Sequence, residues 1–200
     1  MKGVLFTLSA AVFLMAFGLI NSELPIGATI PNADLSLKDI SGKEVSLKKA
    51  VQENGLLVMF SCNTCPVVKG YQARTNEICR YALNKKVGVI LLNSNEGGRE
   101  GGDSFDAMKT YGSNLKYQWY YAVDKDNVLA DAFGAGRTPE CYLFDKNDKL
   151  VYKGAIDDSP SEAGDVQAKY LQSAIDASVA GKDVATKETR SVGCGIKRKS

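Results

Sequence analysis

The feature that most constrains this chain is an apolar run that leads directly into a pair of cysteines. Residues 56–60 read Leu-Leu-Val-Met-Phe, a compact apolar run that predicts a buried β-strand. The run is followed closely by Cys62-Asn63-Thr64-Cys65-Pro66. From Pro66 onward apolar residues recur at helical spacing, and proline suits the first helical turn because its missing N–H costs nothing there. The order strand, C-x-x-C, helix therefore predicts an α/β domain.

The remaining patterns extend this prediction along the chain. Further strands are expected at 87–92, 117–123, 141–144 and 150–153, further helices at 104–111, 127–133 and 162–180, and a short hairpin where 35–37 and 45–47 flank Ser41-Gly42. Asp103 or Ser104 is expected to cap the helix at 104–111. Strands that alternate with helices, followed by a terminal hairpin and helix, predict a central mixed β-sheet flanked by α-helices.

The first 22 residues are predicted to lie outside the folded domain. Lys2 is followed by an apolar stretch at 4–20, which has the form of a secretory signal peptide. The stretch is also just long enough to be retained as an N-terminal membrane anchor. We therefore expect a signal peptide or anchor at 1–22, a folded domain at 23–185, and a solvated basic tail at 186–200 that contains Cys194. Export predicts a periplasmic or extracellular location, where disulfides persist.

The chain contains no histidine, which narrows the chemistry available to it. Ser-His-Asp and Cys-His nucleophilic pairs are excluded, and so are imidazole metal ligands. The five cysteines include no second C-x-x-C, so we expect neither a zinc site nor any other metal or cofactor. The net charge of +2 is too small to predict a nucleic-acid partner. Any proton transfer must therefore use carboxylates, thiols, lysine, tyrosine or water.

A cysteine at the start of a helix is a favourable place for a thiolate. Unpaired N–H groups and the positive end of the helix dipole stabilise the anion, and at such sites the thiol pKa falls from about 8.5 into a range of roughly 3.5–7.5. The thiolate is the nucleophile in disulfide exchange and in attack on peroxides. We therefore predict that Cys62 and Cys65 are the catalytic residues of a redox pair. A purely structural Cys62–Cys65 disulfide is the alternative.

The other three cysteines differ in their surroundings. Cys79 falls on the apolar side of the helix that follows Pro66, and Cys141 lies on an expected central strand, so both are predicted to pack in the core. Cys194 stands between two glycines in the basic tail. We hypothesise that Cys194 is a third redox thiol that pairs with the active-site cysteines or with a partner; a static disulfide or a free thiol are the alternatives.

Several motifs together resemble the thioredoxin-like superfamily. They are Asn63–Pro66, Leu92–Asn95, Thr138–Glu140, Tyr152–Asp158 and Gly193–Lys197. More specifically, the chain is similar to the redoxin group, which is related to alkyl hydroperoxide reductase and thiol-specific antioxidant proteins. The resemblance runs from about Leu24 to Lys199. It implies a thioredoxin-like fold in which the thiols lie at one end of a central sheet.

The resemblance also implies roles for individual residues. Pro139 is expected to be a cis-proline that faces the thiols, with Pro66 and Thr138 as supporting residues of the site. In such folds the backbone beside the cis-proline pairs with an extended substrate segment near the reactive sulfur. Thioredoxins carry Trp-Cys-Gly-Pro-Cys, from which this chain differs before and between its cysteines.

Two other branches of the superfamily are informative by their differences. Peroxiredoxins carry a threonine three residues before the peroxidatic cysteine. Cys62 occupies that position here, although Cys65-Pro66 fits the rest of the pattern and Arg137 lies where an arginine could assist. Thioredoxin-like copper chaperones use C-x-x-x-C-P and a distant histidine, so copper binding is not expected.

The sequence thus predicts an exported thiol–disulfide oxidoreductase that acts on protein thiols or disulfides, together with an unidentified electron donor. Cys62 is the attacking thiol in a thioredoxin arrangement, and Cys65 is the attacking thiol in a peroxiredoxin arrangement. One alternative is a peroxiredoxin-like peroxidase, with Cys65 as the peroxidatic cysteine and a peroxide as substrate. The other is a non-catalytic thioredoxin-like binding module.

Two polar segments complete the expectations. Residues 93–96 (Asn-Ser-Asn-Glu) end a predicted strand on the expected active-site side, so they are expected to line the groove. Asp157-Asp158 precedes Ser159-Pro160 and is expected to be a solvated turn.

Overall fold

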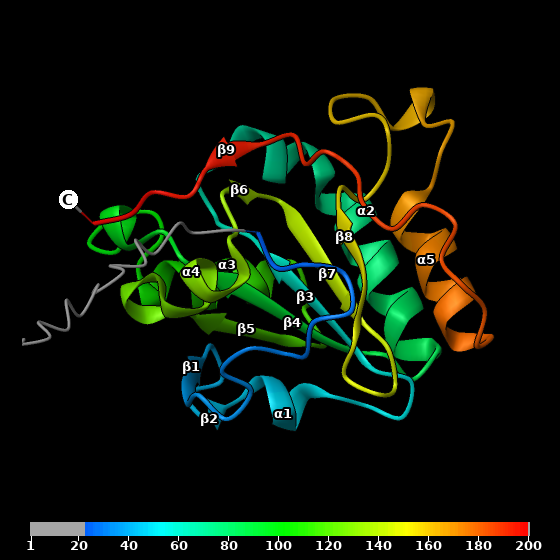
Figure 1. Cartoon of the computed structure of the whole chain (residues 1–200). Helices are drawn as coiled ribbons and strands as arrows, with labels where there is room; N and C mark the ends of the chain where they lie inside the picture. The colour runs from blue at the N-terminus through cyan, green and yellow to red at the C-terminus, as the bar shows by residue number, and fades with distance from the viewer. Residues whose placement is uncertain (1–22, 200) are drawn as a thin grey trace, which may run out of the picture.

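The computed structural model describes residues 23–199, which fold around one seven-stranded β-sheet (Figure 1). Its strands are β1 (Leu37–Asp39), β2 (Glu44–Val45), β3 (Leu56–Phe60), β4 (Gly88–Asn93), β5 (Tyr120–Val123), β7 (Glu140–Phe144) and β8 (Leu150–Gly154), in the order β2-β1-β5-β4-β3-β7-β8. The α-helices are α1 (Leu47–Ala50), α2 (Pro66–Asn84), α3 (Phe105–Asn114), α4 (Val128–Phe133) and α5 (Tyr170–Val179). A separate ribbon pairs β6 (Arg137–Thr138) with β9 (Cys194–Gly195).

The sheet is mixed, and its parallel part lies at the centre. β3 pairs parallel with β4, and β4 pairs parallel with β5. β7 pairs antiparallel with β3, β8 with β7, and β1 with β5. A parallel pair needs a crossover connection, and α2 supplies it between β3 and β4. The predicted α/β class, with a central mixed sheet flanked by helices, is therefore confirmed.

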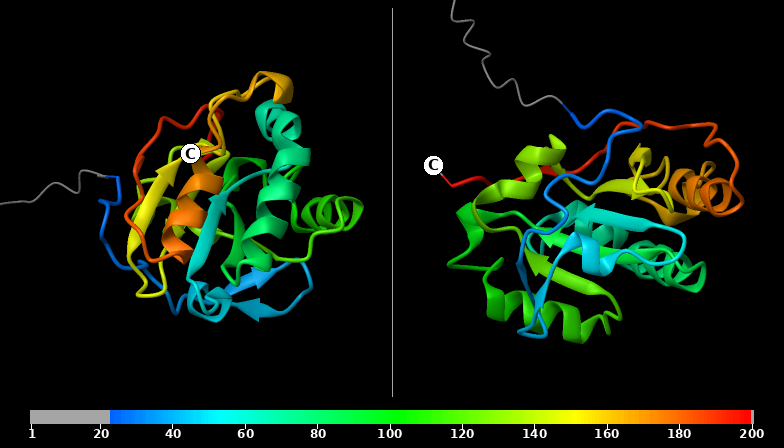
Figure 2. Two further views of the ribbon diagram at one scale, coloured as in Figure 1. Left: turned by 90° about the vertical axis from the view of Figure 1, so that its right-hand side faces the viewer. Right: turned by 60° about the horizontal axis from the view of Figure 1, so that its bottom comes forward.

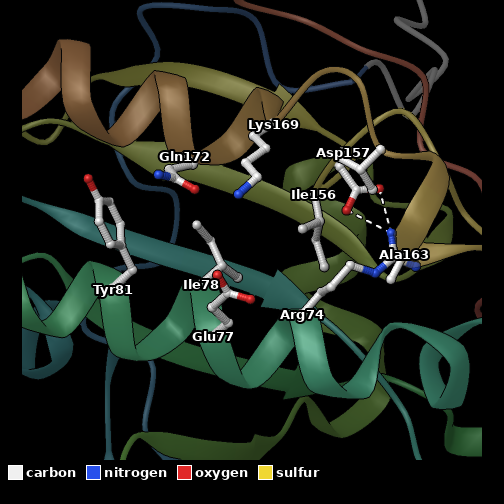
Figure 3. A pocket seen from close by; sticks show the side chains of 10 residues that line it. Arg74, Glu77, Ile78, Tyr81, Ile156, Asp157, Ala163, Lys169 and Gln172 are labelled. Atoms are coloured by element: carbon white, nitrogen blue, oxygen red, sulfur yellow. Dashed lines mark hydrogen bonds and ion pairs between the residues drawn. The ribbon is translucent and has the colours of Figure 1, made fainter.

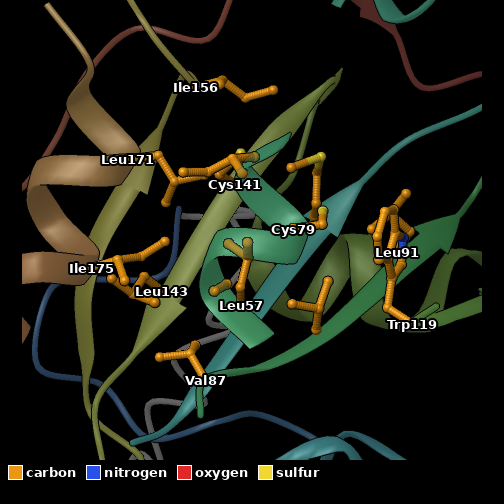
Figure 4. Packing of buried hydrophobic residues seen from close by; sticks show 14 of the residues in the cluster. Leu57, Cys79, Val87, Leu91, Trp119, Cys141, Leu143, Ile156, Leu171 and Ile175 are labelled. Carbon is orange, nitrogen blue, oxygen red and sulfur yellow. The ribbon is translucent and has the colours of Figure 1, made fainter. Parts of the chain in front are cut away.

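Alternation along β3 divides the core into two layers, one on each face of the sheet. Leu57 and Met59 belong to the layer that α2 and α5 cover. Figure 2 shows the two helices on this face of the sheet, and Figure 4 shows Leu57 in the layer. Leu56, Val58 and Phe60 belong to the opposite layer, which α1 and α4 cover. Because side chains of a strand point alternately to the two faces, a continuous apolar run is what a strand buried on both faces requires.

Helix α2 starts at the position that the sequence predicts. Cys65 is the N-cap residue and Pro66 occupies the first helical turn. The buried residues of the helix are the ones expected from the helical spacing: Val68, Tyr71, Thr75, Ile78, Cys79 and Ala82. The C-x-x-C segment is thereby held between a fully buried strand and a helix that packs on the same sheet.

Three expectations about local structure are wrong. The last helix does not begin at Glu162 but at Tyr170. The segment before it forms only a short 3-10 turn, Ala163–Asp165, and then bonds to Asp158: Asp158 N–H donates to Ala168 O (3.2 Å), and Gln167 N–H donates to Asp158 Oδ1 (3.0 Å). The second arm of the short hairpin ends at Val45, since Ser46 caps α1. The strand expected from 117 begins at Tyr120.

The expected solvated tail is also wrong for the segment that carries Cys194. β9 pairs with β6, and Ile196 is only 8% exposed. The glycines and basic residues of this segment show no hydrophobic periodicity that would predict packing. In the folded domain, β6 offers a strand edge to β9, and an apolar core layer accepts Ile196. The signal peptide or anchor expected at 1–22 lies outside the described residues. None of the helices in 23–199 is long and apolar enough to cross a membrane.

Gly88 at the start of β4 is required by close packing. A Cβ there would collide with the carbonyl group of Ala50 and lie 3.2 Å from Gln52 N. Gly88→Ala is therefore expected to lower the free energy of unfolding by about 1–3 kcal/mol, measured by chemical denaturation. Gly70→Ala is the matched control: a Cβ on this exposed helical glycine meets nothing within 4 Å, so alanine should stabilise the protein by about 0.5–1 kcal/mol. Equal effects of the two substitutions would contradict this assignment.

Candidate functional site

Three cysteines meet at the N-terminal end of α2. Cys65 forms a disulfide with Cys194, with the two Cα atoms 5.9 Å apart, although 129 residues separate them in the sequence. Cys62 is a free thiol, and it is buried. Cys62, Cys65 and Val68 form a small apolar cluster against which Val67 and Cys194 pack. The structure thus brings Cys194 to the two cysteines of the C-x-x-C.

Thr138 contacts both cysteines of the motif from the opposite side. Its hydroxyl Oγ1 lies 3.3 Å from Cys62 Sγ, at hydrogen-bonding distance. Its carbonyl oxygen lies 3.5 Å from Cys65 Sγ. The Thr138–Pro139 peptide bond is cis, as the resemblance implies. Only about 1% of Thr138 is exposed, so this residue forms a buried wall of the cysteine cluster.

Asp103 fixes the loop between the two cysteines. Its Oδ1 accepts hydrogen bonds from Asn63 N–H (2.8 Å) and from the side chain of Asn93 (3.0 Å). Its Oδ2 accepts from the Thr64 hydroxyl (2.7 Å) and from the side chain of Asn95 (3.0 Å). The side chain is fully buried. One carboxylate therefore ties the C-x-x-C loop to the end of β4.

The charge of Asp103 is stabilised by these contacts. Burial by itself raises the pKa of this carboxyl. The hydrogen bonds from Asn95, Asn63, Thr64 and Asn93 outweigh burial, so that the pKa lies below its usual value. Buried carboxylates that accept several hydrogen bonds behave in this way, because the bonds favour the ionised form. The anion is thus part of the folded structure.

The sequence predicts that either Asp103 or Ser104 caps α3, and it does not predict the contacts that Asp103 makes. Ser104, not Asp103, caps α3, through its hydroxyl and Ala107 N–H. The available signal was the position of Asn93 and Asn95 at the end of a central strand, which correctly suggested a polar edge near the thiols. The partner of these amides could not be found from spacing, since Asp103 is reached through a glycine-rich loop.

Among the described residues, Arg137 makes no hydrogen bond to a sulfur atom. Its guanidinium donates to Gly193 O (3.1 Å) and the residue is exposed. It therefore holds the C-terminal segment. Pro66 is the first residue of α2, Thr138 lies beside both cysteines, and Pro139 follows it through a cis peptide bond.

Cys79 and Cys141 are packed in the core, as predicted. Both are fully buried in the layer between the sheet and α2 (Figure 4). Burial raises the pKa of each thiol well above its usual value, because a thiolate there would lack solvation. Neither thiol has the environment of a nucleophile.

A hollow of about 440 Å³ lies between α2 and α5, and it contains none of the cysteines (Figure 3). At one end Arg74 Nη1 donates to both carboxylate oxygens of Asp157 (2.8 and 2.7 Å), and Tyr71 donates to the same carboxylate (2.9 Å). Asp157 is 5% exposed, so the expected solvated turn is wrong at this residue. Asp158 is exposed. The ion pair fixes the strand end after β8 against α2.

The sheet order, the cysteine pair at the start of α2 and the cis-proline opposite it define a thioredoxin-like domain. Residues 25–169 match the model of the Redoxin family, and the chain belongs to that family. Thiol-disulfide oxidoreductase ResA of Bacillus thuringiensis (strain Al Hakam) is 25% identical over 151 residues, which are 74% of this chain and 82% of that protein.

Two solved structures are similar over almost the whole chain. An uncharacterized conserved protein from Geobacillus kaustophilus has a TM-score of 0.81 and 33% identity, covering 88% of this chain and 93% of that one. A hypothetical protein from Sinorhizobium meliloti 1021 has a TM-score of 0.80 and 29% identity, covering 90% of this chain and 97% of that one. The predicted family and fold are therefore confirmed.

Asp103→Asn tests the role of the buried carboxylate. An amide group can present an oxygen to only one of the two donor pairs, so the NH₂ group faces the donors of the other pair. We expect a loss of about 1–3 kcal/mol in the free energy of unfolding at neutral pH. Asp183→Asn, on a side chain that is 95% exposed, is the control and should have almost no effect.

The same pair of variants predicts a pH dependence. The pKa of Asp103 is lower in the folded protein than in the unfolded chain, so its stabilisation is complete above the unfolded pKa of about 4 and is lost as the pH falls through the folded pKa. The stability difference between the wild type and Asp103→Asn should therefore shrink below about pH 4. A difference that is constant over the acid range would contradict an ionised Asp103.

Proposed function

We propose that this protein is a thiol–disulfide oxidoreductase in which Cys62 and Cys65 exchange between dithiol and disulfide. The observation that carries the proposal is the grouping of Cys62, Cys65 and Cys194 at the N-terminal end of α2, against Thr138 and the cis-proline. The similarity to thiol-disulfide oxidoreductase ResA supports the same chemistry. The substrates we propose are protein thiols or disulfides, and a separate electron donor restores the dithiol.

The chemistry needs only the residues of this cluster. A thiolate of the pair attacks one sulfur of a substrate disulfide, and the other substrate sulfur leaves as a thiolate that takes up a proton. The second thiol of the pair then attacks the mixed disulfide, which releases the reduced substrate and leaves Cys62–Cys65 as a disulfide. Two electrons pass from the pair to the substrate. The helix N-terminus at Cys65 stabilises negative charge on sulfur during these steps.

Single substitutions test the proposal. Reduced wild type, Cys62→Ser and Cys65→Ser are mixed with a peptide that contains a disulfide, and the loss of that disulfide is followed by mass spectrometry. Both variants should lose at least about 100-fold in turnover, because each removes one of two sulfurs that act as a unit. Cys79→Ala, in the core, is the control and should keep wild-type turnover. Full turnover in both serine variants would contradict the proposal.

Peroxide separates the proposal from its two alternatives. Reduced Cys62→Ser is treated with one equivalent of hydrogen peroxide, and the oxidation state of each sulfur is determined. Slow reaction with peroxide, together with fast exchange of peptide disulfides by the wild type, is the result we expect. Rapid formation of sulfenic acid at Cys65 would favour a peroxidase. No reaction in either assay would leave a binding module with a structural disulfide.

We also propose that the chain is exported by the segment at 1–22, either as a cleaved signal or as a retained anchor. Leu14→Arg places a charge in the middle of its apolar stretch, where insertion then costs about 2.5–3.5 kcal/mol more. Cell fractionation of a bacterial host should find the wild type outside the cytoplasm and Leu14→Arg inside it. Lys2→Arg keeps the charge and is the control. A wild type retained in the cytoplasm would contradict export.

A further inference from the structure

The C-terminal segment Ser191–Lys197 contains the short strand β9, which pairs with β6 and brings Cys194 to Cys65. β9 pairs antiparallel with β6, with Gly195 opposite Arg137 and Cys194 opposite Thr138. Backbone and side-chain bonds extend the contact at both ends: Ile196 N–H donates to Gly136 O (3.0 Å), and the Arg137 guanidinium donates to Gly193 O. Within residues 23–199, β6 pairs with no other strand.

This pairing brings one particular sulfur to the partner strand. Cys65 Sγ lies against the carbonyl oxygen of Thr138, the residue opposite Cys194. A cysteine on a strand paired with β6 is therefore presented to Cys65. Cys62 lies on the hydroxyl side of Thr138 and remains a buried free thiol.

The residues around Cys194 make specific, close contacts with the folded domain. Gly193 approaches β6 so closely that a Cβ would overlap the carbonyl oxygen of Thr138 and lie 2.7 Å from its carbonyl carbon. Ile196 is buried in the core layer that contains α4. Lys197 N–H donates to Asn95 Oδ1 (2.9 Å), and Lys197 Nζ donates to the Thr64 hydroxyl (3.2 Å), between the two cysteines of the motif. The site thus selects glycine, cysteine, an apolar residue and lysine at fixed positions.

We propose that this C-terminal segment is an internal substrate, and that the partners of the enzyme are extended segments in which a glycine directly precedes the reactive cysteine. The proposal rests on the thiol–disulfide exchange proposed above and adds the substrate class to it. Cys65 is the residue that joins the partner sulfur, and Cys62 is the residue that releases it. While the tail is bound, the same edge of β6 is closed to other chains.

Release of the tail needs no external oxidant or reductant. The Cys62 thiolate attacks Cys65 Sγ of the Cys65–Cys194 disulfide. The bond between Cys62 and Cys65 forms, the bond between Cys65 and Cys194 breaks, and Cys194 leaves as a thiolate that takes up the proton lost by Cys62. One disulfide is exchanged for another, and the β6 edge becomes free for an external segment.

The substrate class is tested with peptides. The probe is Ser-Val-Gly-Cys-Gly-Ile-Lys, a copy of residues 191–197, whose cysteine carries a thionitrobenzoate disulfide that releases colour on exchange. The protein carries Cys62→Ser and Cys194→Ser, so that the mixed disulfide with Cys65 accumulates. The matched probe has alanine in place of the glycine before cysteine. We expect the glycine peptide to react about tenfold faster or more, since the alanine methyl collides with β6.

A third substitution tests whether the tail itself blocks the edge. Adding Gly193→Ala to that double variant should displace the tail and raise the rate with the glycine peptide about tenfold. Gly164→Ala, whose Cβ meets nothing within 4 Å and which lies in the segment before α5, is the control and should leave the rate unchanged. Circular dichroism checks that each variant is folded. Equal rates for the two peptides, or no effect of Gly193→Ala, would overturn the inference.

Amide hydrogen exchange tests the release step. Oxidised wild type should contain both Cys65–Cys194 and Cys62–Cys65 disulfides by peptide mapping, and Ser191–Lys197 should exchange faster in it than in oxidised Cys62→Ser, where the tail stays locked. Oxidised Cys79→Ala should match the wild type. Identical tail protection in the wild type and Cys62→Ser, with no Cys62–Cys65 disulfide, would overturn the step. If the wild type exchanges peptide disulfides but shows no preference for glycine, this inference alone fails; without any exchange, the proposed function fails.

Discussion

The arrangement of the cysteines depends on one buried carboxylate. Asp103 accepts four hydrogen bonds, two from the loop between Cys62 and Cys65 and two from the asparagines at the end of β4. The loop between β3 and α2 spans only residues 61–65 and has few internal bonds, so its backbone and polar side chains need partners elsewhere. Asp103 supplies them without exposing the loop to solvent.

The second constraint comes from the opposite side of the cluster. Thr138 offers its hydroxyl to Cys62 and its carbonyl group to Cys65, and its backbone also holds the partner strand β9. One residue thereby links the two sulfurs of the motif to the chain that pairs with them. The same short segment is held by the disulfide, by its pairing with β6 and by the burial of Ile196 in the core. A tail without regular periodicity in its sequence is ordered as a result.

Much of the fold could be predicted because its signals are local. The apolar run at 56–60 is long enough only for a strand, and Pro66 marks the first turn of α2, so both elements are confirmed. The last helix was wrong at its start, since helical spacing continues through Val166 while Asp158 takes the backbone bonds of that segment. A competing side chain that folds back over nine residues leaves no periodic signal.

The candidate site, too, could be predicted only where its signals are local. The type and spacing of Cys62 and Cys65 follow from the sequence, and the motif at 138–140 indicated where the opposite wall lies. The sequence offers Asp103 only as an alternative to Ser104 for the cap of α3 and predicts a solvated turn at Asp157, because a lone aspartate in a polar loop gives no sign of its partner. Their partners, Asn63 and Arg74, lie 40 and 83 residues away.

By itself the sequence determined the α/β class, the position of the C-x-x-C at the start of a helix and the exclusion of histidine-dependent chemistry. These follow from hydrophobic periodicity, turn residues and the absence of histidine, which act over a few residues or over composition. Only the tertiary structure decided that Cys65 pairs with Cys194, that Cys62 remains a thiol and that the tail closes β6. The disulfide joins residues 129 positions apart, and the tail meets β6 across 56 positions; the geometry of these contacts exists only once the sheet has brought the strand ends together.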